Sequence, residues 1–322
     1  MSALLDRVAG APITWGVCEV SGWGEQLPPE RVLGEMAGLG LRATELGPEG
    51  YLPTDPIALR ALLAREGLRL VGGFVPATLH RADGLDGEFE RVGASADLLA
   101  AGGSEVLVLA ASAAADGYEQ GADLDLSDWD RLVRGISRVE EIAAARGLTV
   151  ALHPHYGTAI ERPSHVRRLL DTSSVALCVD TGHLMVGGAD PLEVVRWAVG
   201  RVRHVHLKDV DAELAQRVRS REIGYRDAVA AGMYRPLGEG DVDVSGVVGT
   251  LEGAGFDGWY VLEQDAVLGG IPGEGEGPVH DASASLEFLR RLSAELGGGI
   301  PVEATGRERA AHGAASLSAE EV

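Results

Sequence analysis

The sequence predicts a single-domain (β/α)8 TIM barrel, an α/β fold. Three observations predict it: eight short apolar runs recur along the chain, segments with helical periodicity alternate with them, and glycine follows several of these segments. Alternating strands and helices imply a parallel sheet. Eight repeats favour closure of this sheet into a barrel over an open doubly wound sheet, and 322 residues are enough for such a barrel.

The expected strands and helices follow each other along the whole chain. Apolar runs bounded by turn-forming residues predict strands, whereas apolar residues with helical spacing predict helices. Glycine directly after several helices fits a left-handed helix end, and two prolines open the first helix. The expected strands lie at 11–18, 41–48, 68–75, 105–112, 148–155, 175–183, 203–210 and 258–265, and the expected helices at 28–39, 55–66, 87–101, 127–146, 162–170, 191–199, 244–254 and 283–296.

Two segments depart from this alternation. Residues 211–240 form a long insertion after the seventh expected strand, and their first part, 211–231, has the pattern of a helix. A connection of this length inside a barrel is usually functional. The tail, residues 297–322, is rich in glycine, alanine and glutamate without periodicity, so we expect it to be mobile. The barrel is expected to occupy residues 1–296, with no second domain.

Composition and charge disfavour several classes of function. The 49 acidic and 28 basic residues give a formal net charge of -21, which disfavours binding to nucleic acids or anionic membranes. We find no apolar run of the length that a membrane span or a signal peptide needs. The two cysteines, Cys18 and Cys178, form no disulfide framework, so a reducing, cytoplasmic location is expected.

Polar side chains end four consecutive expected strands. Because side chains alternate between the two faces of a strand, His153, Asp180, His206 and Glu263 lie on the face opposite the larger apolar residues. Active sites of TIM barrels lie at the carboxyl ends of the strands, so these four residues are expected to meet at one mouth. Two imidazoles and two carboxylates suit Mn²⁺, Co²⁺, Fe²⁺ or Zn²⁺ better than Ca²⁺. The pattern therefore predicts a divalent metal site.

Several stretches around these residues carry a family resemblance. They are APITWGVCEVSGWGEQLPPERVL at 11–33, ATELGPEGYLP at 43–53, LHPHYGT at 152–158, CVDTGHLMVGGADP at 178–191, HVHLKDVD at 204–211, YRPLGEGDVD at 234–243 and VLEQD at 261–265. Together they resemble the xylose-isomerase-like TIM-barrel superfamily of sugar isomerases and epimerases, and within it the inosose dehydratases of myo-inositol catabolism. The resemblance implies ligands of the types Glu, Asp, His and Glu at strands five to eight. His153 stands at the first position, where Glu is usual, and His155 is the alternative ligand there.

The resemblance implies a lyase that removes water from a keto-inositol, scyllo-inosose, through an enediolate to give a trihydroxycyclohexane-dione. This chemistry needs a Lewis acid, a base and an acid. Mn²⁺ or Co²⁺ is the metal expected first, with Zn²⁺ and Fe²⁺ as the other candidates. The candidate proton carriers are Glu45, His155, His183 and the pair Lys208 and Asp209, and the sequence does not assign base and acid among them. Lys208 is also a candidate to hold the charge of the enediolate.

Further residues are candidates for contact with the substrate, which is expected to be a small polyol or ketone. Trp15 is a candidate to stack on the substrate ring, with Trp23 as the alternative, and His80 follows the third expected strand. Tyr234 and Arg235 lie in the insertion, where they form a candidate lid.

Other functions stay open. A ketose isomerase or epimerase would use the same metal without loss of water, although His153 in place of Glu weakens a mechanism with two glutamate bases. A non-catalytic sugar-binding barrel is disfavoured by Asp180, His206 and Glu263, and repair of abasic DNA by the negative net charge. Association into a homo-oligomer also stays open, because the sequence carries no interface signal.

Overall fold

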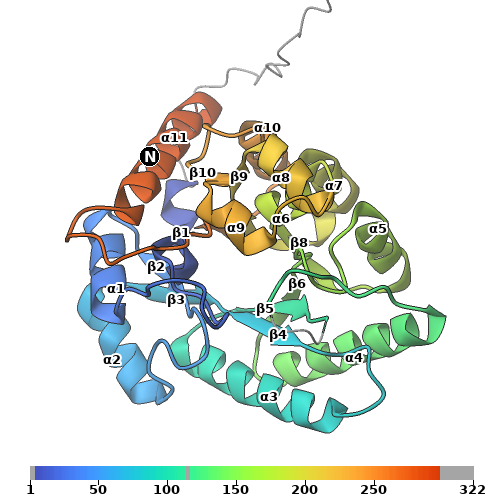
Figure 1. The fold of residues 1–322 in the computed structure, drawn as a ribbon. Coiled ribbons are helices and arrows are strands. Elements are labelled where there is room, and N and C mark those ends of the chain that lie inside the picture. Colours follow the sequence, from blue (N-terminus) through green and yellow to red (C-terminus); the bar gives the residue numbers. More distant parts are fainter. Residues whose placement is uncertain (1–3, 114–116, 298–322) are drawn as a thin grey trace, which may run out of the picture.

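The computed structural model describes residues 4–113 and 117–297, which form a ring of parallel strands surrounded by helices (Figure 1). This is the (β/α)8 barrel that the sequence predicted. Neighbouring strands pair in the order β3-β2-β1-β11-β8-β7-β6-β5-β4, always in parallel. These strands are β1 (Val8–Gly10), β2 (Ala43–Glu45), β3 (Arg69–Gly72), β4 (Phe74–Ala77), β5 (Val106–Ala111), β6 (Thr149–Leu152), β7 (Ala176–Asp180), β8 (Val202–Leu207) and β11 (Trp259–Leu262).

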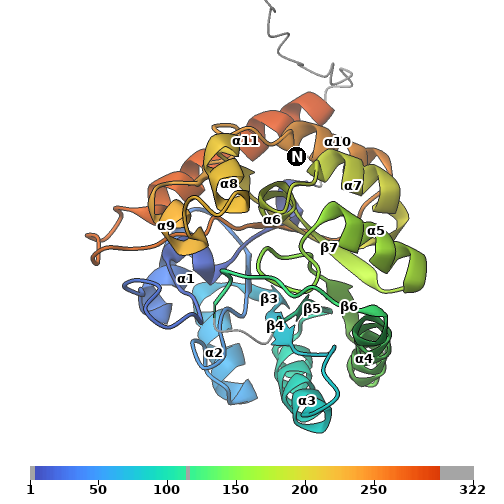
Figure 2. The ribbon, with the colours of Figure 1, turned by 45° about the vertical axis from the view of Figure 1, so that its right-hand side comes forward.

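Most of the helices lie around the outside of this ring in both views (Figures 1 and 2). Each expected helix is present, and the short α6 was not expected because its residues were counted with the preceding strand. The helices are α1 (Pro29–Gly38), α2 (Pro56–Glu66), α3 (Leu85–Gly102), α4 (Leu126–Ala144), α5 (Pro163–Thr172), α6 (Thr181–Val186), α7 (Pro191–Ala198), α8 (Ala212–Arg219), α9 (Tyr225–Ala230), α10 (Val244–Gly253) and α11 (Pro278–Gly297). None of these helices is long and apolar enough to cross a membrane.

The two end strands of the pairing order, β3 and β4, are consecutive halves of one strand. Only Gly73 separates them, and its carbonyl oxygen accepts a hydrogen bond of 3.0 Å from the backbone N–H of Val108 on β5. The ring therefore closes through this interrupted strand. A Cβ atom on Gly73 would lie 2.8 Å from Cδ2 of Leu99 on α3, so a larger residue at the break would force the side chain of Leu99 to shift.

The first strand lies earlier in the chain than the sequence predicted. We expected it at 11–18, but β1 spans Val8–Gly10, and a 3-10 helix occupies Pro12–Trp15. Proline has no N–H to donate to a neighbouring strand, and its fixed φ suits the first turn of a helix. The apolar run therefore marked a helical turn after the strand, and this prediction was wrong.

The insertion at 211–240 packs beside the mouth of the barrel. The short strands β9 (Asp209–Val210) and β10 (Tyr234–Arg235) pair in antiparallel orientation and enclose α8 and α9, so the helical pattern of 211–231 corresponds to two short helices. Helix α8 packs against α6. The tail that we expected to be mobile lies, apart from Gly297, outside the described residues.

Small side chains fill the barrel interior below the polar residues. Ala151 and Cys178 precede His153 and Asp180 on the same strand faces. Because these two side chains are small, they leave room for imidazole rings at the strand ends. Larger apolar side chains lie between the strands and the helices. The interior residues form two buried clusters, Ala9, Ala11, Ala43, Val71 and Val261 in one and Val106, Val108, Ala151 and Cys178 in the other.

Candidate metal centre and active site

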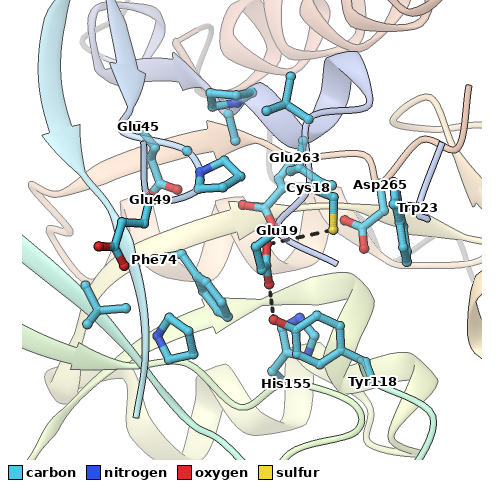
Figure 3. A pocket seen from close by; sticks show the side chains of 18 of the residues that line it. Cys18, Glu19, Trp23, Glu45, Glu49, Phe74, Tyr118, His155, Glu263 and Asp265 are labelled. Atoms are coloured by element: carbon cyan, nitrogen blue, oxygen red, sulfur yellow. Dashed lines mark hydrogen bonds between the residues drawn. The ribbon is translucent and has the colours of Figure 1, made fainter. Parts of the chain in front are cut away.

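A cavity of about 180 Å³ lies at the carboxyl ends of the strands (Figure 3). Much of its wall is apolar or aromatic, with Trp23, Phe74 and Tyr118 among the lining residues. The polar side chains that line it come from several strand ends. A largely apolar pocket with a few converging polar groups is typical of a small-molecule site. The polar residues are Glu19, Glu45, Glu49, Arg91, Ser95, His155, His183, Glu263 and Asp265.

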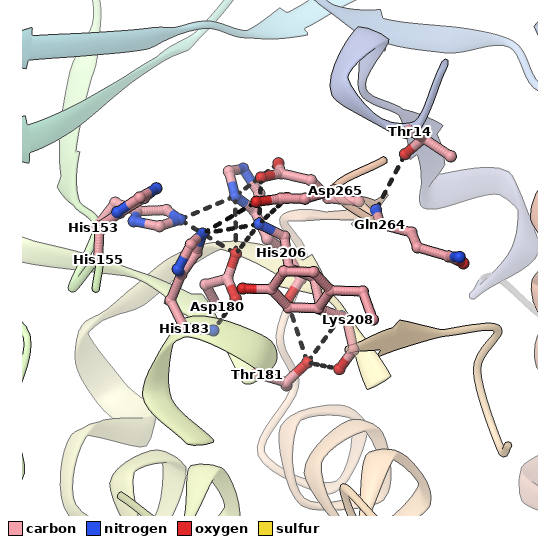
Figure 4. A network of polar contacts seen from close by, with 12 residues as sticks. Thr14, His153, His155, Asp180, Thr181, His183, His206, Lys208, Gln264 and Asp265 are labelled. Atoms are coloured by element: carbon pink, nitrogen blue, oxygen red, sulfur yellow. Dashed lines mark hydrogen bonds and ion pairs between the residues drawn. The ribbon is translucent and has the colours of Figure 1, made fainter. Parts of the chain in front are cut away.

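The four residues expected as metal ligands lie together, and one of them, Glu263, lines this cavity. Figure 4 shows the other three, His153, Asp180 and His206, close to one another. His153 follows β6, Asp180 ends β7, His206 lies on β8 and Glu263 follows β11. Nδ1 of His206 lies 3.1 Å from Nε2 of His153 and 3.5 Å from Oδ2 of Asp180. It also lies 2.9 Å from Oε2 of Glu263, and Nε2 of His153 lies 3.2 Å from Oδ2 of Asp180. The structure therefore brings the four residues to one point.

These separations fit a single divalent cation. Donor atoms bound at about 2.1 Å in tetrahedral or octahedral geometry lie about 3.0–3.4 Å from their neighbours. The donor atoms here lie 2.9–3.5 Å apart. Two imidazole nitrogens at 3.1 Å need a proton or a cation between them, because their lone pairs repel each other. The donor set suits Mn²⁺, Co²⁺, Fe²⁺ or Zn²⁺.

Lys208, the only lysine of the chain, lies buried beside this donor set. Its Nζ is 2.7 Å from Asp265, 2.8 Å from Glu263 and 3.3 Å from Asp180. Burial alone would lower the pKa of Lys208, but these carboxylates outweigh burial and raise its pKa well above the ordinary value. Lys208 is therefore an ammonium ion, and a fourth partner, Nε2 of His183, lies 2.9 Å away.

His155 and His183 are stacked, with ring centroids 3.6 Å apart, and different partners set the same tautomer in both rings. A carbonyl oxygen only accepts, so the contact of 2.6 Å to the Tyr156 carbonyl places the hydrogen of His155 on Nδ1. An ammonium only donates, so the contact with Lys208 leaves Nε2 of His183 unprotonated and its hydrogen on Nδ1. Burial lowers the pKa of both imidazoles well below the ordinary value. Both are therefore neutral near pH 7.

Glu45, at the end of β2, reaches the two histidines of β8. Its Oε1 lies 2.7 Å from Nε2 of His204 and 3.1 Å from Nε2 of His206. Burial alone would raise the pKa of Glu45, but His206 and His204 outweigh burial and lower that pKa. Glu45 is therefore an ionised carboxylate that both imidazoles contact.

The structure places two of the expected substrate contacts, Trp15 and His80, outside the lining of the cavity. The indole of Trp15 is fully buried in the core, and its Nε1 donates to Glu35 at 2.7 Å, so neither ring face is open to a substrate. His80 follows β4, where its carbonyl oxygen accepts from Arg131 at 2.9 Å. Neither residue is among those that line the cavity in the described part of the chain, whereas Trp23 is.

The carboxylate of Asp209, expected as a proton carrier, accepts several backbone hydrogen bonds. Asp209 begins the short strand β9 directly after Lys208, which lies between β8 and β9. Its carboxylate accepts backbone hydrogen bonds of 2.8–3.0 Å that hold the turn after β10. A carboxylate occupied in this way has no free oxygen for a substrate. The donors are the N–H groups of Val210, Gly238, Gly240 and Val242.

The structure also places Tyr234 and Arg235, the expected lid, away from the lining of the cavity. Tyr234 is buried, and its ring lies 5.3 Å from Nζ of Lys208. Arg235 pairs with Asp211 at 3.1 Å on the partly exposed side of the insertion. Neither side chain is among the cavity-lining residues that the structure describes. The insertion therefore packs against Lys208 instead of covering the cavity.

Asp265 and Tyr225 belong to the site, although the sequence analysis did not select them. Asp265 lines the cavity, contacts Lys208 and accepts a hydrogen bond of 2.7 Å from the hydroxyl of Tyr225 on α9. The hydroxyl of Tyr225 also lies 2.9 Å from that of Tyr234. Strand alternation places Asp265 on the face of Glu263, two residues earlier, and this signal would have identified it. No comparable pattern connects Tyr225 with Asp265.

Comparisons with known proteins identify the family of this chain. Residues 33–292 match the family model described as xylose isomerase-like TIM barrel. The chain is 32% identical over 267 residues to an inosose dehydratase of Geobacillus thermodenitrificans, covering 79% of this chain and 88% of that one. It is 31% identical over 299 residues to the rhizopine catabolism protein MocC of Rhizobium meliloti, covering 90% of each.

Solved structures with low sequence identity share the fold. One is the probable 3-DHS dehydratase AsbF of Bacillus anthracis, with a TM-score of 0.65, 16% identity and coverage of 88% of this chain and 98% of that one. Another is the IOLI protein with a bound zinc atom, with a TM-score of 0.67, 12% identity and coverage of 90% and 99%. At these identities, the similarity extends to the fold alone.

Proposed function

The chain belongs to the xylose isomerase-like TIM-barrel family, and from this premise we propose that it is a metal-dependent dehydratase of a keto-inositol, scyllo-inosose. Its similarity to inosose dehydratases makes it a lyase. One observation carries the proposal of metal dependence: four donor atoms converge at separations of 2.9–3.5 Å beside a cavity for a small molecule.

The donor set would hold Mn²⁺ or Co²⁺ through His153, Asp180, His206 and Glu263. A cation bound there would act as a Lewis acid toward the ketone oxygen and a neighbouring hydroxyl. The charges agree with this occupancy, because Asp180 and Glu263 neutralise a divalent cation while Asp265 balances Lys208. Buried charges that are neutralised in this way carry a smaller desolvation penalty.

We propose that His155 is the base. The Tyr156 carbonyl holds the hydrogen of His155 on Nδ1, so Nε2 is free to take the proton from the carbon next to the ketone. The electrons of the broken C–H bond move toward the ketone oxygen and form an enediolate. Because burial lowers the pKa of His155, its imidazole is in the unprotonated form that a base needs.

We propose that His183 is the acid. Lys208 occupies Nε2 of His183, and Nδ1 has no hydrogen-bond partner among the described residues. Nδ1–H is therefore available to protonate the hydroxyl that leaves from the next carbon, while Nε2 takes a proton from the Lys208 ammonium, so that the imidazole of His183 stays neutral. The electrons of the enediolate form the new double bond as that C–O bond breaks, and water departs. The remaining enol becomes the second ketone of a trihydroxycyclohexane-dione.

The test is to incubate the protein and Mn²⁺ with scyllo-inosose and to follow the absorbance of the conjugated enol-dione, with the loss of one water confirmed by mass spectrometry. We expect turnover that a chelator abolishes and that added Mn²⁺ restores. The matched control is His280→Gln, which changes an exposed histidine outside the site. Interconversion of common ketoses without any dehydration of scyllo-inosose would contradict the proposal and favour an isomerase or epimerase.

A further inference from the structure

Glu45 and His204 lie on the far side of His206 from the proposed metal ligands. We propose that Glu45, held in place by His204, is a positioning residue that keeps the hydrogen of His206 on Nε2 and so directs the lone pair of Nδ1 at the metal. This inference rests on the proposed metal-dependent function. It gives Glu45 a role different from the proton transfer expected from the sequence.

The hydrogen-bond partners of His206 support this assignment. A carboxylate oxygen only accepts, so Oε1 of Glu45, at 3.1 Å, requires a hydrogen on Nε2 of His206. Nδ1, on the other side of the ring, faces Glu263 and Asp180 at 2.9 and 3.5 Å. An imidazole that binds a metal through one nitrogen usually donates from the other to a carboxylate or carbonyl group. Glu45 and His206 have this arrangement.

His204 provides a second hydrogen-bond partner that holds the carboxylate of Glu45 in place. The two histidines are two residues apart on β8 and therefore point to the same face of the strand. Nε2 of His204 lies 2.7 Å from the oxygen of Glu45 that also contacts His206. Nδ1 of His204 is buried without a hydrogen-bond partner in the described part of the chain. A hydrogen on that nitrogen would be buried and unpaired, which favours donation from Nε2 to Glu45.

Gly72 provides the space that this group occupies. A Cβ atom at Gly72 would lie 2.8 Å from Oε1 of Glu45 and 3.2 Å from Nε2 of His204. Any other residue at the end of β3 would displace the carboxylate from one or both imidazoles. Gly72, the last residue of β3, therefore leaves the room that the Glu45 carboxylate occupies.

The test measures Mn²⁺ binding and not turnover. Carboxylate partners of metal-binding histidines typically contribute about 10–100-fold to metal affinity. We therefore expect Glu45→Leu to raise the Kd for Mn²⁺ by about 10–100-fold. Glu45→Gln, whose amide oxygen still accepts a hydrogen bond, is expected to recover much of the lost affinity. His280→Gln, the exposed control, is expected to bind Mn²⁺ as the wild type does.

A second measurement reads the tautomer directly in the wild type. In ¹H–¹⁵N spectra of the Zn²⁺-loaded protein, His206 is expected to carry its hydrogen on Nε2. A hydrogen on Nδ1, or equal Mn²⁺ affinities for Glu45→Leu and the wild type, would overturn the inference. Equal affinities of Glu45→Leu and Glu45→Gln, both below wild type, would overturn the hydrogen-bond argument. A wild-type protein that binds neither metal would instead overturn the proposed function itself.

Discussion

Replacing Lys208 with methionine removes the only ammonium side chain of the protein, and the ion pairs around it determine the consequence. Nζ of Lys208 contacts Asp265, Glu263 and Asp180 at 2.7, 2.8 and 3.3 Å, and its side chain is fully buried. Removing one partner of a buried ion pair costs about 3–5 kcal/mol, because a buried charge is left uncompensated. At about 2 °C per kcal/mol for a chain of this size, Tm of the metal-free variant should fall by about 6–10 °C.

The same substitution should strengthen metal binding. Asp180 and Glu263 contact both Lys208 and the proposed cation site, so the ammonium competes with a cation for their charge. At an effective dielectric constant of about 20, unit charges 4 Å apart interact by about 4 kcal/mol, so even a partly screened effect exceeds tenfold in Kd. Mn²⁺ should therefore raise Tm more in Lys208→Met than in the wild type. Turnover should still fall by about 10²-fold or more, because His183 loses the partner that sets its tautomer.

Differential scanning calorimetry with and without Mn²⁺ measures both effects. The matched control is Arg138→Met, which removes an exposed cation paired with Glu141. A surface pair of this kind contributes about 0–1 kcal/mol, so its Tm should change by about 2 °C or less. A metal-free Lys208→Met variant as stable as this control, or one in which Mn²⁺ stabilises less than in the wild type, would refute the reasoning.

Three further predictions follow from the same contacts. The amide of His183→Gln lies near the position of Nε2, and this variant should lower kcat for scyllo-inosose by about 10²–10⁴-fold. The amide of His183→Asn lies near the position of Nδ1, so this variant should keep more of the turnover. Equal losses of kcat in both variants would remove Nδ1 from the mechanism. Burial alone would lower the pKa of His206, but Cys178, Glu263 and Glu45 raise it well above the ordinary value, so Mn²⁺ must displace a proton from His206. Calorimetry in buffers of different ionisation enthalpy should therefore detect release of about one proton near pH 7 and weaker binding as the pH falls; binding without proton release would contradict this. Tyr225→Phe deletes the hydroxyl that donates to Asp265. The free energy of unfolding, measured by urea titration, should fall by about 1–2 kcal/mol. An unchanged free energy would show that this hydrogen bond does not contribute to stability.

The barrel and the proposed ligands were predictable because both depend on short-range periodicity. Alternation along single strands placed His153, Asp180, His206 and Glu263 on one face, and the fold class placed the four strand ends at one mouth. The first strand was misplaced because the apolar run at 11–18 contains Pro12, which begins a helical turn. Periodicity alone does not distinguish a short strand from a short apolar helix.

The chemical state of the site was not predictable in the same way. His155 and His183 were selected from the sequence, but their tautomers depend on the Tyr156 carbonyl and on Lys208. Of these contacts, only the one with Tyr156 is local in sequence. Trp15 was misassigned because an aromatic residue near a strand end has the same pattern whether it faces a cavity or, as here, the core. Contacts between distant elements therefore decide these roles.

Anomalous diffraction at the manganese edge, from crystals grown with MnCl₂, tests the proposed metal centre most directly. We predict one strong peak per chain, within about 2.0–2.3 Å of Nε2 of His153, Nδ1 of His206 and carboxylate oxygens of Asp180 and Glu263. The same crystals soaked in chelator should lose the peak. No peak between these four side chains, or manganese bound only elsewhere, would contradict a metal-dependent function at this site.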